Sequence, residues 1–274
     1  MFKMLYVVTL FVVVSVSGNS PLPTDQEKKD GTGGRKGALK VMSYNIHHCN
    51  PPSEKEKIDV AAIARVINQE KPDLVALQEV DNYTERSGKH LHQARELARL
   101  TGMRSFFMKA LDFQGGEYGV AVLSRLPIVD SVGYLLPRHA ELGGEDRAVA
   151  TITVMVPGGG KVVFASTHLD LKEGNRISQA EAIVGHFRDT PLPMILAGDF
   201  NAQVGSKTIN YLDQHFTRSC AHDCQPTIPV ENPDRAIDFV MMTPKRNLRP
   251  VSTWVIAEKY ASDHLPVVAV ISMK

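Results

Sequence analysis

The 274-residue chain has little of several features that mark specialised proteins. It carries one tryptophan, three cysteines and 22% charged residues, with 31 basic side chains against 30 acidic ones. This near neutrality argues mildly against a dedicated binder of long nucleic acid, because neutralising phosphates supplies most of such a protein's affinity. We find no internal repeat, and 43% hydrophobic residues are enough for a sizeable core. One large globular domain is the default interpretation.

An uncharged apolar run near the start of the chain is too short to span a bilayer, which takes about 20 apolar residues. The run extends from Met4 to Val16 and follows Lys3. Ser15 and Ser17 have the spacing of a signal-peptidase site, so we predict a signal peptide over residues 1–17. An uncleaved anchor or a buried strand is the alternative. After cleavage we expect a secreted or periplasmic protein with no transmembrane anchor.

The segment after the predicted signal is rich in proline, glycine and charge. This composition predicts a flexible linker over residues 18–38, followed by one domain over residues 39–274. Removal of residues 1–17 takes away one lysine and no acid, so the basic count falls from 31 to 30 and equals the 30 acids. The mature chain is therefore about neutral, and a local basic patch remains compatible with that balance.

Two of the three cysteines lie four positions apart. Cys220 and Cys224 form either a local disulfide in an exported protein or two free thiols in a loop. A Cys/His metal-binding protein built on these residues and His222 is a non-enzymatic alternative. Zinc sites usually need four ligands, and no second Cys/His cluster lies nearby. Cys49 is either a small buried hydrophobe or a free thiol.

Apolar runs and helical spacing alternate along the rest of the chain. A capping box of Ser53 and Glu56 is expected to begin the first helix, which stops before Pro72. Two further helices are expected around residues 91–98 and 177–187. Many strands with helices between pairs of them favour packed sheets flanked by helices. The predicted strands cover residues 39–44, 74–77, 103–109, 118–124, 129–134, 148–156, 162–167, 194–197, 237–242, 251–256 and 267–273.

Polar side chains gather at the ends of these predicted strands. One acid in such a place is usually a turn or cap residue. Several together favour a single site at one edge of the sheets, where ligand sites in sheet proteins are commonly built. The residues concerned are Asn45, Glu79, His168, Asp199, Asn201, Asp238, Asp263 and His264.

These residues lie in six motifs whose order and separation resemble those of the endonuclease/exonuclease/phosphatase family. The resemblance extends over roughly residues 40–274. It implies an α/β (α+β) fold, a four-layer αββα sandwich of two mostly antiparallel β-sheets flanked by helices. It also implies a metal-dependent phosphoric ester hydrolase. The motifs are Ser43-Tyr44-Asn45-Ile46, Leu77-Gln78-Glu79-Val80, Thr167-His168-Leu169-Asp170, Gly198-Asp199-Phe200-Asn201, Ile237-Asp238-Phe239 and Ser262-Asp263-His264-Leu265-Pro266-Val267.

The resemblance implies Mg²⁺ as cofactor, with Mn²⁺ as a substitute. Mg²⁺ takes oxygen ligands, and we expect them from the Glu79 carboxylate and the Asn45 amide. A neutral amide beside one carboxylate leaves the ion with positive charge to place on a phosphate oxygen. Asp263 is expected to touch a metal or its water.

The resemblance also implies roles in catalysis. Asp199 would deprotonate the attacking water, and Asn201 would help to place water and phosphate. His264 would pair with Asp238, which fixes its ring and favours the charged form.

Arg147 and His168 would stabilise charge that develops on the phosphate. The alternative for Arg147 is a loop ion pair with Glu145 or Asp146. Asp170 and His47 or His48 either support the site, face the substrate or are solvated. Tyr118 either lines the cleft or is an exposed strand residue, and Arg176 and Gln179 are expected on the surface of the third helix.

The sequence therefore predicts an exported Mg²⁺-dependent hydrolase of phosphoesters, above all phosphodiesters, in which water attacks phosphorus in line. A DNA or RNA endonuclease and a sphingomyelinase-type phospholipid phosphodiesterase are the alternatives. No long basic loop for DNA is evident, and the single Trp254 falls in a predicted strand, not in a membrane-facing hairpin. A binding module with a relict site would have lost one of the key residues, and none is replaced. No feature indicates a protein partner, and we expect a monomer that acts on a phosphoester substrate.

Overall fold

The computed structural model describes residues 37–221, 223–244 and 247–273. The predicted signal peptide and residues 18–36 of the predicted linker lie outside the described residues. No helix within the described ranges has the length and apolar character needed to cross a membrane.

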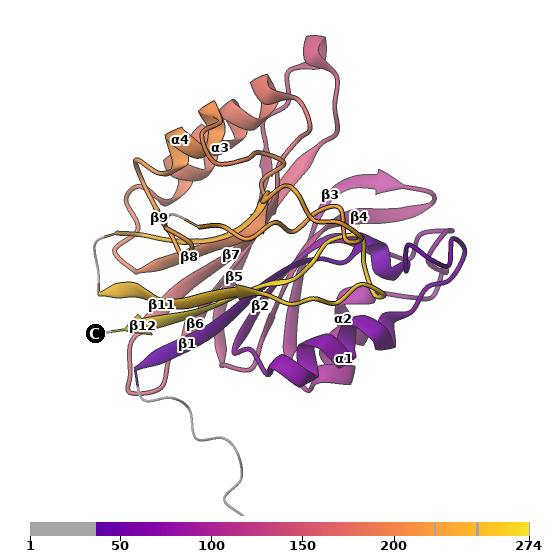
Figure 1. Cartoon of the computed structure of the whole chain (residues 1–274), viewed down its shortest axis with the longest axis horizontal. Helices are drawn as coiled ribbons and strands as arrows, with labels where there is room; N and C mark the ends of the chain where they lie inside the picture. Colours follow the sequence, from indigo (N-terminus) through magenta and orange to yellow (C-terminus); the bar gives the residue numbers. More distant parts are fainter. Residues whose placement is uncertain (1–36, 222, 245–246, 274) are drawn as a thin grey trace, which may run out of the picture. The chain divides into compact units, whose positions relative to one another are not determined.

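Two six-stranded sheets form the centre of the fold (Figure 1). Sheet A has the strand order β11-β12-β1-β2-β4-β3, and sheet B has the order β5-β6-β7-β8-β10-β9. The strands of sheet A are β1 (Ala38–Asn45), β2 (Leu74–Asn82), β3 (Arg104–Phe113), β4 (Gly116–Ser124), β11 (Leu248–Val255) and β12 (Val267–Met273). The strands of sheet B are β5 (Ile128–Leu136), β6 (Arg147–Met155), β7 (Lys161–His168), β8 (Met194–Asp199), β9 (Thr217–Arg218) and β10 (Asp238–Met242).

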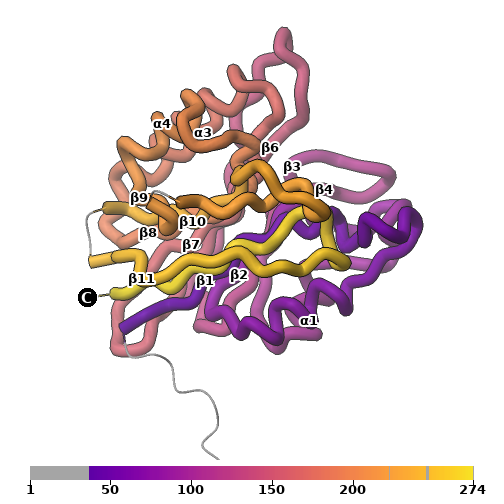
Figure 2. The backbone as a smooth tube through the Cα atoms, in the orientation of Figure 1, coloured from indigo at the N-terminus to yellow at the C-terminus, as the bar shows by residue number. Residues whose placement is uncertain are grey.

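Helices cover the outer face of each sheet. The helices α1 (Val60–Glu70) and α2 (Gln93–Thr101) pack on sheet A, whereas α3 (Glu173–Phe187) and α4 (Lys207–Leu212) pack on sheet B. Figure 2 shows the last strand of the domain returning to the first, and β12 runs antiparallel to β1. The predicted four-layer sandwich is confirmed.

The order of layers follows from the alternation of side chains along each strand, because successive residues point to opposite faces. In β1, Val41 joins the apolar cluster between the sheets, and Met42 joins the cluster beneath α1 and α2. In β7, Phe164 faces the space between the sheets and Ala165 faces the helices. Full burial of one such large apolar side chain stabilises the fold by about 1.5–3 kcal/mol.

Each sheet contains one parallel pair of strands, joined by a helical crossover. β1 and α1 lead into β2 in sheet A, and β7 and α3 lead into β8 in sheet B. The other strand pairs within the described residues are antiparallel. The predicted mostly antiparallel sheets are thus confirmed, and each predicted strand corresponds to an observed one.

The predicted start of the first helix is wrong. α1 begins at Val60, and its N-cap is Asp59, whose carboxylate accepts from the Ala62 amide. Ser53 lies in a turn because the Asn50 side chain donates to the backbone carbonyls of two residues in the 51–57 segment. These bonds hold the segment in turns and move the helix start downstream.

The cysteine alternatives are resolved by a bond between Cys220 and Cys224. A disulfide has no thiolates to offer a metal, so the proposed Cys/His zinc site is wrong; His222 lies outside the described residues. Cys49 is both buried and free, so it combines the two alternatives given for it. Burial raises the pKa of its thiol.

Candidate active site

The carboxyl ends of the two parallel strand pairs meet at one edge of the sandwich. A cleft of about 370 Å³ lies there, and both sheets contribute to its lining. Most of the polar residues predicted at strand ends come together in or directly behind this cleft. Its polar lining includes Glu79, Arg147, His168, Asp199, Asn201 and His264.

Glu79 lies within β2, two residues beyond the end of the predicted strand. The pairing of β2 with β4 shifts register between Leu77 and Val80, and Glu79 has a φ of 56°. A left-handed conformation costs a residue with a side chain about 1–3 kcal/mol, and such strain concentrates at functional sites. The bulge turns the half-buried Glu79 carboxylate into the cleft.

Asn45 links the two sheets at the floor of the site. Its amide nitrogen donates to Glu79 Oε1 at 3.0 Å and to Asp199 Oδ2 at 3.1 Å, and its Oδ1 accepts from the His47 amide at 3.1 Å. The nitrogen therefore faces the carboxylates, and an oxygen ligand requires the amide to be turned over. A metal-ligand role for Asn45 stays a prediction.

Asp199 is the buried centre of the polar network. Its carboxylate accepts hydrogen bonds from the Asn45 side chain and, at 2.8 Å, from the backbone N–H of Asn201. The same carboxylate lies 3.5 Å from His168 Nε2 and 3.8 Å from His264 Nε2. Burial, followed by the nearby charge of Asp238, raises the pKa of Asp199 to about 7. A carboxyl with such a pKa can accept a proton near neutral pH.

Asp238 and His264 form the expected pair. Asp238 is the first residue of β10, beside Asp199 on β8, and its Oδ2 accepts from His264 Nδ1 at 2.9 Å and from the Thr227 hydroxyl. Burial lowers the pKa of His264, but the charge and hydrogen bond of Asp238 outweigh it and raise that pKa to about 10. His264 is therefore an imidazolium at neutral pH, with Nε2–H on the side of Asp199.

His168 ends β7 and is neutral. Burial, and then the charges of Arg147 and His264, hold the pKa of His168 well below its usual value. Arg147 lies 3.2 Å from His168 Nδ1, and its guanidinium can only donate in this contact. Arg147 also pairs with Glu145 at 3.1 Å, which is the ion pair that the alternative predicted. A catalytic role for Arg147 stays a prediction.

Asn201 holds the loop after β8 in place. It has a φ of 48°, a left-handed conformation that Asn adopts more readily than most residues. Its side-chain nitrogen donates to the Leu169 carbonyl at 2.9 Å and lies 3.0 Å from His168 Nε2. The amide therefore bridges the ends of β7 and β8.

Asp263, like Asn45 and Asp238, is not part of the cleft lining. Its carboxylate lies 3.4 Å from the Ser262 hydroxyl. Ser262 in turn donates to the Asn45 carbonyl at 2.7 Å and so fixes the loop before β12 against β1. A metal role for Asp263 stays a prediction.

The interpretation of Gln179 as a helix-surface residue is wrong, because its side chain is fully buried. Its Oε1 accepts from the Asp170 amide, and the buried Asp170 carboxylate accepts from the Glu145 amide at 3.0 Å and from Asn175. This network holds the loop that carries the ionic partner of Arg147. The four-residue spacing of Asn175 and Gln179 was a signal for a buried polar face.

Tyr118 and Arg86 form a wall of the cleft, and the sequence offered Tyr118 as a cleft residue but did not indicate Arg86. Tyr118 is buried, not exposed as expected for a strand tyrosine, and burial raises its pKa. The Arg86 guanidinium lies over Phe113, 4.5 Å from the ring centroid, and binds the Asp81 carboxylate through two nitrogens at 2.7 and 2.9 Å. Arg86 follows a turn, where strand patterns give no guide.

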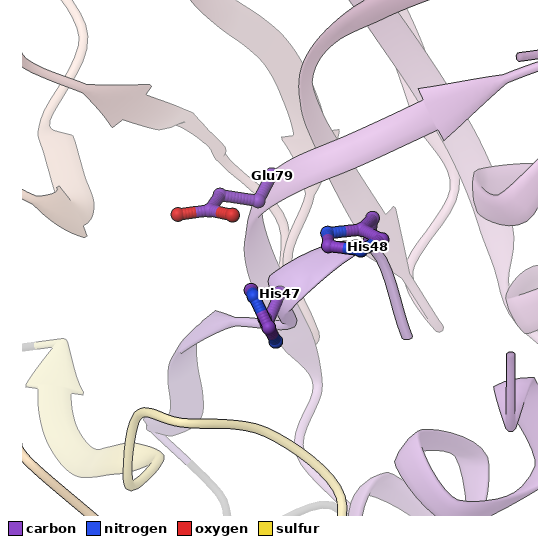
Figure 3. A group of neighbouring side chains, drawn as sticks. All are labelled: His47, His48 and Glu79. Carbon is purple, nitrogen blue, oxygen red and sulfur yellow. The ribbon is translucent and has the colours of Figure 1, made fainter. Parts of the chain in front are cut away.

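His47 and His48 follow Asn45 in a tight left-handed turn beside Glu79 (Figure 3). Three residues in succession, from His47 to Cys49, have φ values of 44°, 42° and 60°. Burial, and then the charge of Arg86, lower the pKa of His48 to about 4. Both rings are half-buried, and contact with a substrate stays a prediction for them.

The donor groups of the site fit a divalent cation. Among the described residues, Glu79 receives one hydrogen bond, from Asn45, and its second oxygen has no such partner. Asp199, Asp238 and His264 form a buried group whose ligand atoms lie within 4.8 Å of one another. Carboxylate oxygens that face one cleft are the donors that hard divalent cations prefer.

Comparisons with known proteins agree with this geometry. A sequence profile described as "Endonuclease/Exonuclease/phosphatase family" matches residues 42–264. No curated protein sequence matches the chain significantly.

Solved structures give the same picture. An endonuclease/exonuclease/phosphatase from Beutenbergia cavernae is 28% identical with a TM-score of 0.74, over 86% of this chain and 72% of that one. The mannosyl-6-phosphatase of Bacteroides thetaiotaomicron is 19% identical with a TM-score of 0.68, over 86% of this chain and 100% of that one. The human Nocturnin catalytic domain is 21% identical with a TM-score of 0.69, over 88% and 95%. The last two likenesses concern the fold alone.

The match to the family profile covers most of the chain, and the six motifs converge on one cleft. The chain therefore belongs to the endonuclease/exonuclease/phosphatase family of phosphoester hydrolases, whose members use divalent metals.

Proposed function

We propose that the protein is an exported, Mg²⁺-dependent hydrolase of phosphodiesters. The observation that carries this proposal is the environment of Asp199. One buried carboxylate, with a pKa raised to about 7, contacts Asn45 and the Asn201 amide and lies beside two histidines at the floor of an open cleft. A base held so firmly at near-neutral pKa suits the deprotonation of water.

The residues around Asp199 divide the work of the reaction. Asp199 takes the proton of the attacking water, and Asn201 orients its carboxylate. The charged His264, held by Asp238, donates toward the phosphate, and His168, held by Arg147, lies beside Asp199. Donors fixed in advance are the main source of catalysis in phosphoryl transfer. Arg147 adds a second positive charge at the cleft.

Mg²⁺ bound by Glu79, with Asn45 beside it, would polarise a phosphate oxygen and withdraw charge from phosphorus. One carboxylate leaves such an ion with net positive charge, which matches an anionic substrate.

The cleft favours a diester over a bare phosphate. Beside its charged groups, apolar side chains line it: Leu111, Phe113, Tyr118, Leu171 and Ile228. An apolar wall next to a phosphate site suits an organic group attached to phosphorus, and about 370 Å³ accommodates a small molecule or the end of a larger one.

A substrate panel tests this proposal. Bis-aryl and mono-aryl phosphates, plasmid DNA, RNA, sphingomyelin and inositol phosphates are incubated with purified protein in Mg²⁺, in Mn²⁺ and in chelator. We expect Mg²⁺-dependent turnover that is faster on the bis-aryl ester than on the mono-aryl ester. Preference for the monoester would overturn the diester assignment, and turnover unaffected by chelator would overturn the metal dependence.

Export is supported by the apolar N-terminal run and by the Cys220–Cys224 disulfide, since such bonds persist mainly in oxidising compartments. We expect the protein in the exported fraction of the producing cell, with a mature N-terminus at Gly18. N-terminal sequencing of that fraction tests this. An intact Met1 on protein in the cytoplasmic fraction would contradict it.

A further inference from the structure

The proposed reaction assigns no role to His47 and His48, the two histidines beside Glu79. His47, His48 and Glu79 each offer one ligand atom, and these atoms all lie within 4.8 Å of one another. Figure 3 shows the two rings and the carboxylate gathered around the strand end that carries Glu79. This cluster is separate from the buried group that Asp199 and Asp238 of sheet B form with His264, which comes from the loop before β12.

His47 is held in the tautomer that a metal ligand needs. Its Nδ1 lies 2.9 Å from the Asn50 carbonyl oxygen, and because a carbonyl only accepts, Nδ1 carries the proton. The lone pair of the neutral ring is therefore on Nε2. Histidines that bind metals commonly donate their other ring N–H to a backbone carbonyl in this way, which fixes the direction of the free nitrogen.

The other two groups also have donor atoms that the protein does not use. Nδ1 of His48 is buried with no hydrogen-bond partner among the described residues. One Glu79 oxygen accepts from Asn45, and the second has no partner within the same part of the chain. An unpaired buried nitrogen is costly, and a bound cation is one way to satisfy it.

The backbone is bent in a way that brings adjacent rings together. Neighbouring side chains in a strand point to opposite faces. In the left-handed turn, the rings of His47 and His48 lie 4.5 Å apart between centroids. Gln93 holds this turn from α2 by donating to the His48 carbonyl at 2.6 Å.

We propose that His47, His48 and Glu79 form a binding site for a first-row transition-metal ion of the Zn²⁺ or Mn²⁺ class. Two imidazoles and one carboxylate suit Zn²⁺ and its neighbours, whereas Mg²⁺ prefers an all-oxygen set. Arg86, a positive charge in the same cleft as Glu79, is paired with Asp81 through two hydrogen bonds. The site does not depend on the proposed reaction, although it shares Glu79 with the proposed Mg²⁺ site.

Calorimetric titration of the full chain with Zn²⁺, after chelator treatment and in excess Mg²⁺, tests the site. We expect one Zn²⁺ equivalent to bind to the wild-type protein. His47→Gln and His48→Gln should each weaken that binding tenfold or more. His186→Gln is the matched control, because His186 stacks on Tyr134 at the end of α3, and it should bind as the wild type does.

The outcomes separate this site from the proposed function. Absence of Zn²⁺ binding, or unchanged binding in both histidine variants, would overturn the site whatever the activity. Absence of phosphodiester hydrolysis with Zn²⁺ binding that follows the expected pattern would overturn the proposed function alone. If either variant fails to fold, NMR of the wild-type histidine rings decides. Zn²⁺ should then shift the resonances of His47 and His48, and a shift confined to His168 or His264 would overturn the site.

Discussion

Each of the two sheets contributes to the active-site cleft through a parallel strand pair joined by a helix, yet the side chains that the two pairs place there differ in chemistry. The pair from sheet A ends in Asn45 and the half-buried Glu79, together with the two histidines of the left-handed turn. The pair from sheet B ends in His168 and Asp199, both buried.

The difference in burial explains the difference in chemistry. On sheet B, burial and the neighbouring Asp238 raise the pKa of Asp199. Asp238 also raises the pKa of His264, which lies before β12 of sheet A and pairs with Asp238, so Asp199 and His264 can both hold or release protons. On sheet A, Glu79 keeps an oxygen free of hydrogen bonds within the described residues. We therefore expect sheet A to bind cations and sheet B to move protons, and variants on the two sides should fail in different ways.

The largest effect is expected from Asp199→Asn on sheet B. Loss of a positioned base lowers turnover by about 10²–10⁴-fold. Because the pKa of Asp199 is raised to about 7 in the folded protein, the wild type loses stability as pH rises from about 4 to about 7. Asp199→Asn should therefore be at least as stable as the wild type above pH 7. Rates and thermal melts measure both, with the exposed Asp213→Asn as control. Near-normal turnover would remove Asp199 from the reaction.

A second large effect is expected from the His264–Asp238 pair. His264→Ala and Asp238→Asn should each lower kcat by about 10²–10³-fold, because the carboxylate orients the ring. The double variant should lose much less than the product of the two losses, since the pair acts as a unit. Single-turnover rates and melts of the three proteins decide. A large fall in stability with normal turnover in the folded fraction would indicate a purely structural pair.

On sheet A, Glu79→Gln should act through the metal. We expect the Mg²⁺ concentration at half-maximal activity to rise by about tenfold or more, with lower turnover at saturation. Glu145→Gln removes another cleft carboxylate, one that pairs with Arg147, and should leave the Mg²⁺ midpoint in place. Equal midpoints in wild type and Glu79→Gln would assign the ion to other residues.

The smallest effect concerns stability alone. The pKa of His264 is raised from 6.5 to about 10, so the stabilisation from its pairing is complete below pH 6.5 and is lost as pH rises through about 10. A hydrogen bond to a charged group contributes about 1.5–3 kcal/mol. The unfolding free energy of wild type minus that of Asp238→Asn, measured from pH 6 to pH 10.5, should decline over this window. A constant difference would show that His264 is not charged in the folded protein.

The sequence predicted most of the site because its residues lie where apolar strands end. Asp199 and His168 follow continuous apolar runs, and strand direction alone brings them to one edge. The positive φ of Glu79 was not predictable, because no glycine marks the bulge. The same holds for the turn at His47. Gln179 was assigned to the surface because its polarity outweighed its place on the buried face of α3. In each case a long-range contact overrides the local pattern.

The apolar layer between the sheets has a consequence for the reaction itself. Glu79 belongs to one sheet and Asp199 to the other, and beneath them Gln78 donates to Ser166 across the gap at 3.1 Å. The side chains of that layer, with Phe164 among the largest, therefore act as a spacer that sets the reach between cation and base. A substitution that shortens a buried side chain of this layer would change the distance between the cation at Glu79 and the base Asp199. A packing defect far from solvent would therefore change the geometry of catalysis.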